Sequence, residues 1–258
     1  MKRTALITGA SSGIGLELSR IFASNGHNLV LVARNQEALG QLKLELVQKH
    51  RIEVLIIIKD LSVYGSAAEV HDIVVKAGVQ VDYLVNNAGF GSFGPFDETS
   101  WKTVDQMVLL NIHTLTQLTH LFLPGMISRK FGRVLQLAST ASFQPGPLMA
   151  VYFATKAFVL HFSEALDEEL RGKGVTVTAL CPGPTESGFQ AVADILDSKL
   201  VKGRKLPSSK EVAEYGYKSM MQGKRIAIHG TMNRLLAFST RLFPRRLVVT
   251  LTRKIQEK

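Results

Sequence analysis

Two side chains four residues apart could carry acid–base chemistry. Tyr152 and Lys156 stand at positions i and i+4, so on a helix they share one face, one turn apart. A free phenol has a pKa of about 10 and is a poor base at neutral pH. An ammonium about 4 Å away would lower that pKa by roughly three units before desolvation opposes the change. We therefore expect Lys156 to lower the pKa of Tyr152 toward the working pH, where proton transfer is efficient.

A hydroxyl group precedes this pair at the end of an apolar segment. Ser139 closes the predicted strand 133–139, and open α/β sheets bind their ligands at the carboxyl ends of the strands. The Ser139 hydroxyl could hold a substrate carbonyl oxygen beside the phenol. Because Tyr-x-x-x-Lys is common by chance, the prediction depends on this context.

A glycine-rich turn follows the first predicted strand, 4–10, and opens a helix over 16–25. Glycines permit a tight turn and let backbone N–H groups approach a pyrophosphate, which the helix N-terminus also attracts. The spacing TGxxxGxG differs from the common fingerprint GxGxxG, and a plain helix cap is the alternative interpretation. The predicted dinucleotide contacts are Gly9, Ser11, Ser12, Gly13, Ile14 and Gly15.

The end of the second predicted strand, 28–34, indicates which nicotinamide cofactor to expect. An acidic residue there would bind the ribose 2′-hydroxyl of NAD, but the sequence has Ala33 followed by Arg34. A guanidinium can bind a 2′-phosphate, so NADP(H) is favoured over NAD(H). Asp60 ends the third predicted strand and could accept from the adenine amino group. The alternatives are a solvated Arg34 and an Asp60 that caps a helix or forms a turn.

Short apolar segments predict the strands that position these groups. Several are continuous in Leu, Ile and Val, which is typical of parallel strands buried on both faces. Segments with helical spacing lie between them, so we predict an α/β fold: a doubly wound parallel sheet with helices on both faces. The predicted strands are 4–10, 28–34, 53–61, 83–89, 133–139, 175–183 and 225–230.

The composition, 46% hydrophobic and 20% charged over 258 residues, excludes a disordered, collagenous or coiled-coil chain. The single Cys181 excludes a disulfide framework and is interpreted as a core residue. The His residues lack ligand spacing, so no catalytic metal is predicted. The first apolar segment starts at Thr4, so we expect no secretory leader. The uncharged segments 106–128 and 134–155 predict a buried interior helix and a strand plus loop rather than membrane spans.

Taken together, these pieces resemble the short-chain dehydrogenase/reductase family in its shorter, single-domain form. The resemblance spans about residues 3–230. It implies a Rossmann-type sheet in the strand order 3-2-1-4-5-6-7 and reversible hydride transfer between a nicotinamide cofactor and a carbonyl or secondary alcohol. The motifs that carry it, in the family's order, are the glycine turn, Asp60, Asn86-Asn87-Ala88-Gly89, Asn111, Ser139, Tyr152 with Lys156, and Pro182-Gly183.

The resemblance also implies residue roles. Tyr152 would be the general acid/base, Lys156 would support the tyrosinate and bind the nicotinamide ribose, and Ser139 would orient the substrate oxygen. Asn111 would hold a water chain that feeds protons to Lys156, or bond to the backbone as a buried helix residue. Ser187 stands where many members have Thr. The remaining cofactor contacts would be Leu61, Asn87, Ala88, Gly89, Pro182, Gly183 and Thr185.

The predicted substrate is a hydrophobic ketone or a 3-oxoacyl compound. Segment 189–206 would be a lid that covers an apolar substrate or packs on the body of the protein. A non-catalytic NADP-binding scaffold or sensor is the alternative function, which the intact set of Ser139, Tyr152, Lys156 and Asn111 disfavours. Apolar loop residues expected near the same pocket are Phe90, Phe93, Phe96, Phe143, Pro145, Leu148 and Met149.

The net charge of +10 comes from the C-terminal part of the chain. Residues 1–198 hold 16 Lys and Arg against 18 Asp and Glu, whereas residues 199–258 hold 15 against 3. Residues 231–258 extend beyond the predicted core, 1–230, and their spacing predicts two short basic amphipathic helices interrupted at Pro244. They could pack on the body or on a second subunit, lie on an anionic membrane, or bind an acidic carrier or nucleic acid. Nucleic acid is disfavoured because no known motif is present.

We expect the whole chain, 1–258, to form one dinucleotide-binding catalytic domain. The predicted location is the cytoplasm, with peripheral membrane contact through 231–258. By analogy with the family, the predicted assembly is a homo-oligomer, either a dimer or a tetramer.

Overall fold

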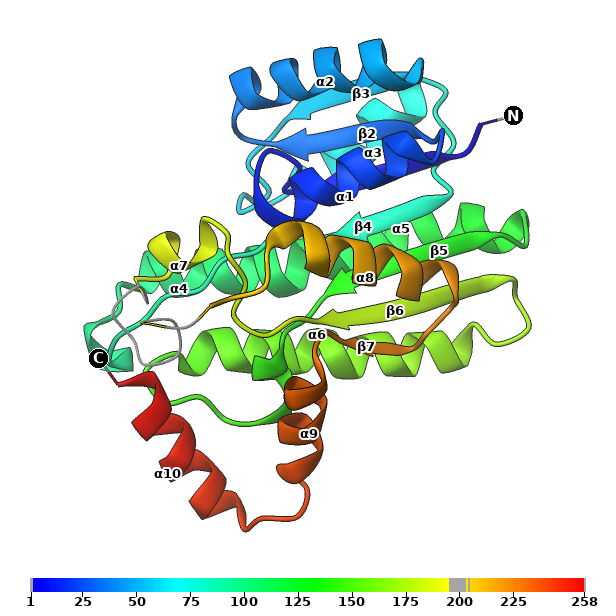
Figure 1. Cartoon of the computed structure of the whole chain (residues 1–258). Helices are drawn as coiled ribbons and strands as arrows, with labels where there is room; N and C mark the ends of the chain where they lie inside the picture. The colour runs from blue at the N-terminus through cyan, green and yellow to red at the C-terminus, as the bar shows by residue number, and fades with distance from the viewer. Residues whose placement is uncertain (1, 195–202, 204, 258) are drawn as a thin grey trace.

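The structure, a computed structural model, describes residues 2–194, 203 and 205–257. Within them, a parallel sheet of seven strands has the order β3-β2-β1-β4-β5-β6-β7 (Figure 1). The predicted α/β sheet and its strand order are therefore confirmed. The strands are β1 (Thr4–Thr8), β2 (Asn28–Ala33), β3 (Val54–Ile58), β4 (Tyr83–Asn86), β5 (Gly132–Leu137), β6 (Val175–Cys181) and β7 (Ile226–Ile228).

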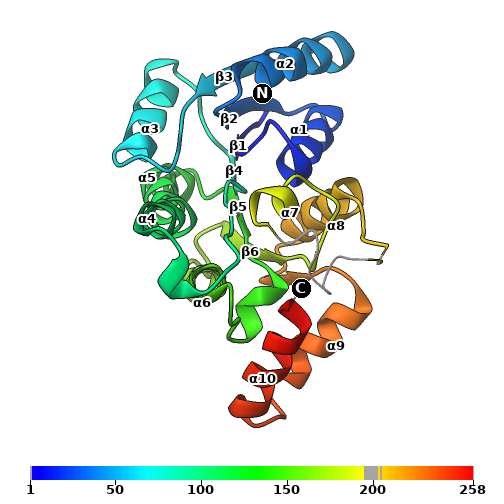
Figure 2. The same cartoon turned by 90° about the vertical axis from the view of Figure 1, so that its left-hand side faces the viewer.

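Helices cover both faces of the sheet (Figure 2). One face carries α1 (Gly13–Ser24), α2 (Gln36–His50) and α8 (Ser209–Met221). The other carries α3 (Ser66–Lys76), α4 (Trp101–Val108), α5 (Leu115–Ser128) and α6 (Ala150–Glu169). Short helices lie in the loops after β4, β5 and β6: η1 (Phe96–Glu98), η3 (Thr140–Phe143) and α7 (Phe189–Val192).

The first strand shows why a continuous apolar segment suits this position. All five residues of β1 are buried. Ala5 and Ile7 pack with the α1 and α2 side of the core, whereas Leu6 packs with the α3 and α5 side. Because successive side chains of a strand point to opposite faces, both sets must be apolar when helices cover both faces.

Several strands end two or three residues earlier than predicted. The segments predicted at 4–10 and 83–89 leave the sheet after Thr8 and Asn86, and β5 ends at Leu137 rather than at Ser139. Gly9, with φ +67°, turns the chain away from β1, a conformation that glycine adopts without strain. The residues beyond the strand ends form the candidate site.

The interior helix predicted at 106–128 is a composite. Helix α4 runs into a π-helical turn, η2 (Leu109–Thr114), which continues into α5. Such a turn holds one extra residue, and π-turns occur often at functional sites. Among the described residues, no helix is both long enough and apolar enough to cross a membrane.

The chain ends in two helices beyond the edge strand β7. Helix α9 (Thr231–Ser239) and helix α10 (Arg245–Gln256) are separated at Pro244, as predicted. Figures 1 and 2 show both helices projecting from the body below β7.

Candidate active site

The glycine turn lies between β1 and α1, at the carboxyl edge of the sheet. The turn uses positive φ at Gly9 (+67°) and Gly13 (+55°). The side chain of Ser12, at the N-cap of α1, makes no capping hydrogen bond, so it leaves the first N–H groups of the helix to a ligand. A Cβ at Gly15 would collide with the Gly9 carbonyl and the Asn87 side chain. Gly15 therefore lets α1 approach the sheet closely.

A hydroxyl group ties this turn to the neighbouring strand. The Thr8 hydroxyl accepts hydrogen bonds from the backbone N–H groups of Asn87 and Ala88, both at 3.0 Å. The Asn87 side-chain amide donates to the carbonyls of Thr8 (2.9 Å) and Gly9 (3.3 Å). Two of the predicted cofactor residues, Asn87 and Ala88, thus hold the glycine turn in place. The part played by Thr8 was missed, because a strand threonine carries no spacing signal.

Arg34 and Asp60 meet at the ends of β2 and β3. The Arg34 guanidinium lies 3.9 Å from the Asp60 carboxylate, and the Arg34 side chain is 76% exposed. Asp60 also accepts from the Ser62 backbone (2.9 Å) and hydroxyl (2.6 Å), so the turn-forming alternative holds as well. Desolvation raises the pKa of Asp60, but the Ser62 bonds and Arg34 outweigh it and the pKa is lowered. The carbonyl of the next residue, Leu61, accepts from Thr114 at 2.8 Å.

Helix α6 carries Tyr152 and Lys156 on one face, as predicted. Both side chains are buried, with 9% and 4% exposure. The Lys156 ammonium lies 5.8 Å from the centre of the Tyr152 ring and donates to the Leu137 carbonyl at 2.6 Å. The end of β5 therefore fixes the lysine.

The expected effect of Lys156 on the pKa of Tyr152 is wrong for this arrangement. Burial raises the pKa of Tyr152 to about 12, opposed by a hydrogen bond with Ser139. Burial also lowers the pKa of Lys156 to about 8. The ammonium points at the Leu137 carbonyl, so desolvation dominates the phenol.

Ser139 stands at the N-cap of η3, where its hydroxyl accepts from the Ala141 N–H at 3.1 Å. The Ser142 hydroxyl accepts from the Ser139 N–H (3.3 Å) and donates to the Lys156 carbonyl (2.7 Å). Ser142 thereby ties the Ser139 loop to α6. Ser142 was not predicted from the sequence, although Ser-x-x-Ser is close to a capping-box pattern that could have identified it.

Asn111 lies in the π-helical turn, 1% exposed. Its amide donates to the Phe90 carbonyl (2.9 Å) and the Thr155 hydroxyl (3.1 Å), and its oxygen accepts from the Phe90 N–H (3.2 Å). The backbone-bonded alternative is thus confirmed. The water-chain role stays a prediction, although a Cβ at Gly89 would lie 3.0 Å from the Asn111 oxygen and 3.4 Å from the Lys156 nitrogen. Asn111 and Lys156 thus flank the same glycine.

The turn after β6 is braced from two sides. The Thr140 N–H donates to the Pro182 carbonyl, and the Thr185 hydroxyl donates to the Gly183 carbonyl, both at 2.9 Å. A Cβ at Gly183 would lie 2.6 Å from the side-chain nitrogen of Asn233, a residue of α9. The C-terminal region therefore packs directly on this turn, a contact that sequence spacing could not reveal.

An apolar wall lies over the phenol. The Phe189 and Tyr152 rings are 5.2 Å apart, and a Cβ at Gly91 would come within 3.0 Å of both. Phe90, Phe93 and Met149 join the same cluster, as predicted.

The other predicted pocket residues lie apart from this wall. Phe96 is 61% exposed, and Leu148 accepts from the Gly94 N–H at 2.8 Å. Phe143 and Pro145 line a groove beside α10 instead. The prediction for Phe96, Phe143 and Pro145 is therefore corrected.

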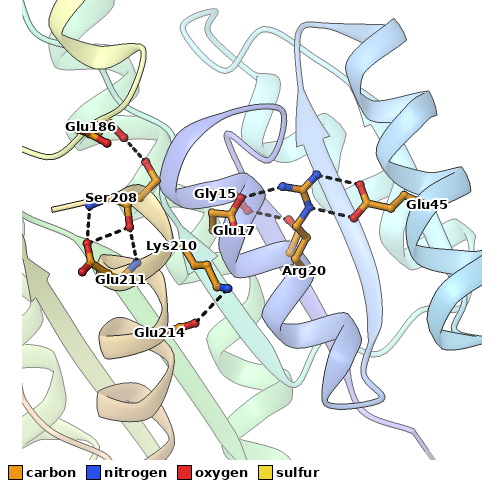
Figure 3. A network of polar contacts seen from close by, with 11 residues as sticks. Gly15, Glu17, Arg20, Glu45, Glu186, Ser208, Lys210, Glu211 and Glu214 are labelled. Carbon is orange, nitrogen blue, oxygen red and sulfur yellow. Dashed lines mark hydrogen bonds and ion pairs between the residues drawn. The ribbon is translucent and has the colours of Figure 1, made fainter.

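The predicted lid, 189–206, is described except for 195–202 and 204. The residues that flank it are joined, because the Ser209 hydroxyl donates to the Glu186 carbonyl at 2.6 Å and the Glu186 N–H donates to the Pro207 carbonyl at 2.9 Å. A capping box between Ser208 and Glu211 starts α8 beside them (Figure 3). A Cβ at Gly13 would lie 3.3 Å from Ser187, so the lid base contacts the glycine turn.

Cys181 is buried, and burial raises the pKa of its thiol to about 12, which agrees with a core residue. Across the described part of the chain, no group of three or more His, Cys, Asp and Glu residues is gathered as a metal site would require.

Comparison with known proteins agrees with this arrangement. A family model described as short chain dehydrogenase matches residues 3–194. The solved short-chain dehydrogenase from Sphingobium yanoikuyae in complex with NADPH has a TM-score of 0.83 and 29% identity, covering 93% of this chain and 94% of that one.

Curated relatives are similar over part of their length. The very-long-chain 3-oxoacyl-CoA reductase of Anas platyrhynchos is 34% identical over 184 residues, 69% of this chain and 58% of that protein. The reductase of the same description from Pyrenophora tritici-repentis is 38% identical over 177 residues, 67% of this chain and 52% of that protein. The chain thus spans just over half the length of these relatives.

Proposed function

Because the chain belongs to the short-chain dehydrogenase family, we propose that it transfers hydride between NADP(H) and a carbonyl or secondary alcohol. The observation that carries the proposal is the convergence of Ser139, Tyr152 and Lys156 at the carboxyl edge of the sheet: the Ser139 hydroxyl is near enough to the phenol to lower its pKa, and Lys156 is fixed one helical turn from Tyr152. A scaffold or sensor that only binds a dinucleotide would not need a buried ammonium beside a buried phenol.

The glycine turn and Arg34 fit NADP(H). The cradle around Gly9 and Gly15 leaves no room for side chains, and the first turn of α1 offers N–H donors to a pyrophosphate. Arg34 is exposed and able to bind a 2′-phosphate, so NAD(H) is the less favoured cofactor. The cofactor supplies or accepts the hydride. The other proposed contacts are Ser11, Ser12, Gly13, Ile14, Asp60, Leu61, Asn87, Ala88, Gly89, Pro182, Gly183 and Thr185.

The chain's own residues handle the proton. With a pKa of about 12, Tyr152 is protonated at neutral pH and can donate its hydroxyl proton to the substrate oxygen during reduction. Ser139 holds that oxygen by a hydrogen bond. The ammonium of Lys156, 5.8 Å from the centre of the ring, would then offset part of the burial penalty on the tyrosinate. Asn111 fixes the turn beside Gly89. Alcohol oxidation uses the same steps in reverse.

The proposed substrate is a hydrophobic ketone or a 3-oxoacyl compound. The wall formed by Phe90, Phe93, Met149 and Phe189 around Tyr152 supports an apolar chain next to the reacting carbon. The relatives described as very-long-chain 3-oxoacyl-CoA reductases support the same substrate class.

The organisation of the chain is also part of the proposal. We propose a single domain, 1–258, with a catalytic core (1–230), a lid (189–206) and a basic extension (231–258). The protein would act in the cytoplasm as a homo-oligomer, a dimer or tetramer, with peripheral membrane contact through the extension.

The test is NADPH oxidation with a panel of ketones and 3-oxoacyl thioester analogues, followed at the nicotinamide absorbance band. Tyr152→Phe should abolish turnover while NADPH still binds, whereas Tyr64→Phe, at an exposed position, should change neither. Tight NADPH binding without turnover of any carbonyl would favour the scaffold. Failure to bind NADPH would overturn both functions.

A further inference from the structure

The two C-terminal helices expose a concentration of large apolar side chains. Nine such residues between 231 and 257 are 44–68% exposed, whereas the rest of the described chain exposes eleven. We call helices α9 and α10, with the turn between them, the arm (231–257). Its exposed apolar residues are Met232, Leu235, Leu236, Phe238, Leu242, Phe243, Leu247, Leu251 and Ile255. So many exposed apolar side chains within one short segment are typical of an interaction surface.

The same helices carry unpaired positive charge. Residues 231–258 contain seven Lys and Arg and a single Glu. The one ion pair of the arm among the described residues joins Arg253 and Glu257 at 3.3 Å, and Arg234 bonds to a carbonyl and to the Tyr215 hydroxyl. No described acidic group pairs with Arg241, Arg245, Arg246 or Lys254. These charges remain available to an anionic partner.

The body of the protein does not cover this surface. In α10 the one fully buried side chain is Gln256, and neither polar atom of its amide has a hydrogen-bond partner among the residues that the structure describes. An open groove of about 410 Å³ separates α9 from the edge strand, between Ile226 and Ile228 on one wall and Ala237 and Phe238 on the other. Unpaired buried amides and open grooves are features of a poor packing surface.

We propose that the arm docks on a membrane leaflet rich in anionic lipid, with its apolar residues in the acyl boundary and its arginines among the headgroups. Charge favours this occupant over a second copy of the chain. Two arms of the same positive sign would repel each other, and residues 1–198 carry a net charge of only −2. Anionic headgroups attract every unpaired cation, and amphipathic basic helices gain further from burial of their apolar face.

The docked arm brings lipid close to the candidate active site. At its root, Asn233 packs on Gly183. Farther along, Arg241 and Arg245 line a groove together with Ser142, which bonds to Ser139. Figure 2 looks onto the carboxyl ends of the strands, and the end of α10 lies in front of the sheet there. A long acyl substrate held in the leaflet would therefore face the edge of the sheet at which Tyr152 lies; this orientation rests on the proposed catalytic activity, whereas binding of the arm to lipid does not.

The experiment is flotation of the full chain with vesicles of equal parts phosphatidylglycerol and phosphatidylcholine, at low and high salt, without cofactor. We expect binding that high salt weakens and that pure phosphatidylcholine does not support. Arg241→Gln with Arg245→Gln and Arg246→Gln should weaken binding about a hundredfold. Leu235→Gln with Leu242→Gln and Leu251→Gln should reduce it comparably.

Matched body variants provide the controls. Lys43→Gln with Lys49→Gln and Lys76→Gln removes three exposed charges outside the arm and should leave flotation nearly unchanged. Leu44→Gln removes an exposed apolar residue of α2 and should do the same. Thermal melting of each variant separates loss of binding from loss of folding, because all these side chains are exposed.

Several results would overturn the proposal. The proposal is wrong if the chain does not float with anionic vesicles at low salt. It is also wrong if the arm variants and the body variants lose flotation equally, because this would indicate general electrostatic attraction without a docking surface. A lower oligomer mass in the leucine variant, together with unchanged flotation, would assign the arm to a second copy.

Activity separates the two proposals. Tyr152→Phe should float like the unmodified chain, so loss of turnover with intact flotation would leave the membrane contact standing. Turnover of a soluble ketone should be unchanged in the arm variants. Turnover of a vesicle-embedded 3-oxoacyl substrate should fall with flotation, and equal turnover there would overturn the orientation of the site toward lipid.

Discussion

The body and the arm of this molecule differ in how their polar groups are satisfied. In the body, Asn86, Thr119 and Gln136 bond to one another at 2.9–3.0 Å inside the core, and Thr8 and Asn87 join two strand ends. In the arm, Arg241, Arg245 and Arg246 have no described acidic partner, Arg253 pairs only with Glu257 of the arm itself, and large apolar side chains are exposed. At these positions the body satisfies its polar groups internally, whereas the arm presents the chemistry of an interface.

Lys156 provides the strongest test of this contrast, because it is a buried charge that the body holds without a carboxylate partner. Lys156→Met should reduce kcat by about a thousandfold, because the tyrosinate loses its support. It should also stabilise the fold at pH 7. A pKa lowered from 10.5 to about 8 means that burying the charge costs about 3 kcal/mol.

The same shift fixes how stability depends on pH. The unfolded chain binds the Lys156 proton up to pH 10.5 and the folded chain only to about pH 8, so the native protein should gain stability as pH rises between these values. Urea unfolding of native protein, Lys156→Met and the exposed control Lys173→Met tests both statements. A destabilised Lys156→Met at pH 7 would show that the lysine is adequately solvated after all.

Arg34 is an exposed cation of the body, and we compare it with the exposed arginines of the arm. Arg34→Ala should weaken NADPH binding about ten- to a hundredfold, because a charge-assisted contact to the 2′-phosphate is lost. NADH binding should be nearly unchanged. Fluorescence titration with both cofactors measures the ratio, and Lys43→Ala on the neighbouring helix should alter neither. Equal losses for NADPH and NADH would remove Arg34 from cofactor selection.

The dependence of kcat/KM on pH tests whether buried Lys156 and Tyr152 must both be protonated for reduction. For reduction, kcat/KM should be level below about pH 8 and then fall about tenfold per unit as Lys156 loses its proton. Tyr152 stays protonated through this range, since burial raises its pKa to about 12. A profile that is flat to pH 10 would mean that the ammonium is not required.

Asn233 joins the two regions, and its effect should be the smallest. Asn233→Ala removes a 2.8 Å hydrogen bond to the His229 carbonyl and the packing on Gly183. We expect the KM for NADPH to rise about threefold with kcat unchanged, as for one ordinary hydrogen bond. Met232→Ala, at the exposed neighbouring position, is the matched control. Unchanged kinetics in Asn233→Ala would show that the contact between the arm and the turn at Gly183 does not affect cofactor binding.

The fold was predictable because burial on both faces imposes continuous apolar segments. The continuous apolar segments around β1 and β6 indicated buried parallel strands. The order of the strands in the sheet followed from the family resemblance. The strand ends were less predictable. Ser139 and Gly89 extend apolar segments in the sequence, but they leave the ladder because backbone torsion and side-chain bonds turn the chain there.

The residues of the site could be predicted from the sequence, but their hydrogen-bond partners and pKa shifts could not. Spacing placed Tyr152 and Lys156 on one helix face, but it could not reveal that Leu137 accepts from the lysine. The pKa of Tyr152 therefore shifts opposite to expectation. Ser142, Thr155 and Asn233 were missed because each acts through a partner distant in the sequence or through a local bond that many Ser, Thr and Asn residues make.

The π-helical turn at Leu109–Thr114 has a consequence for insertions and deletions. Each helical residue advances the chain by about 100°, and a π-turn stores one residue beyond the α-helical count. Deleting a residue from this turn would convert it to α-helix and swing Asn111 away from the carbonyl of Phe90. The number of residues in this six-residue turn thus sets the direction in which Asn111 points. Deletion of one residue there should lower activity far more than deletion of one residue in the loop before α4.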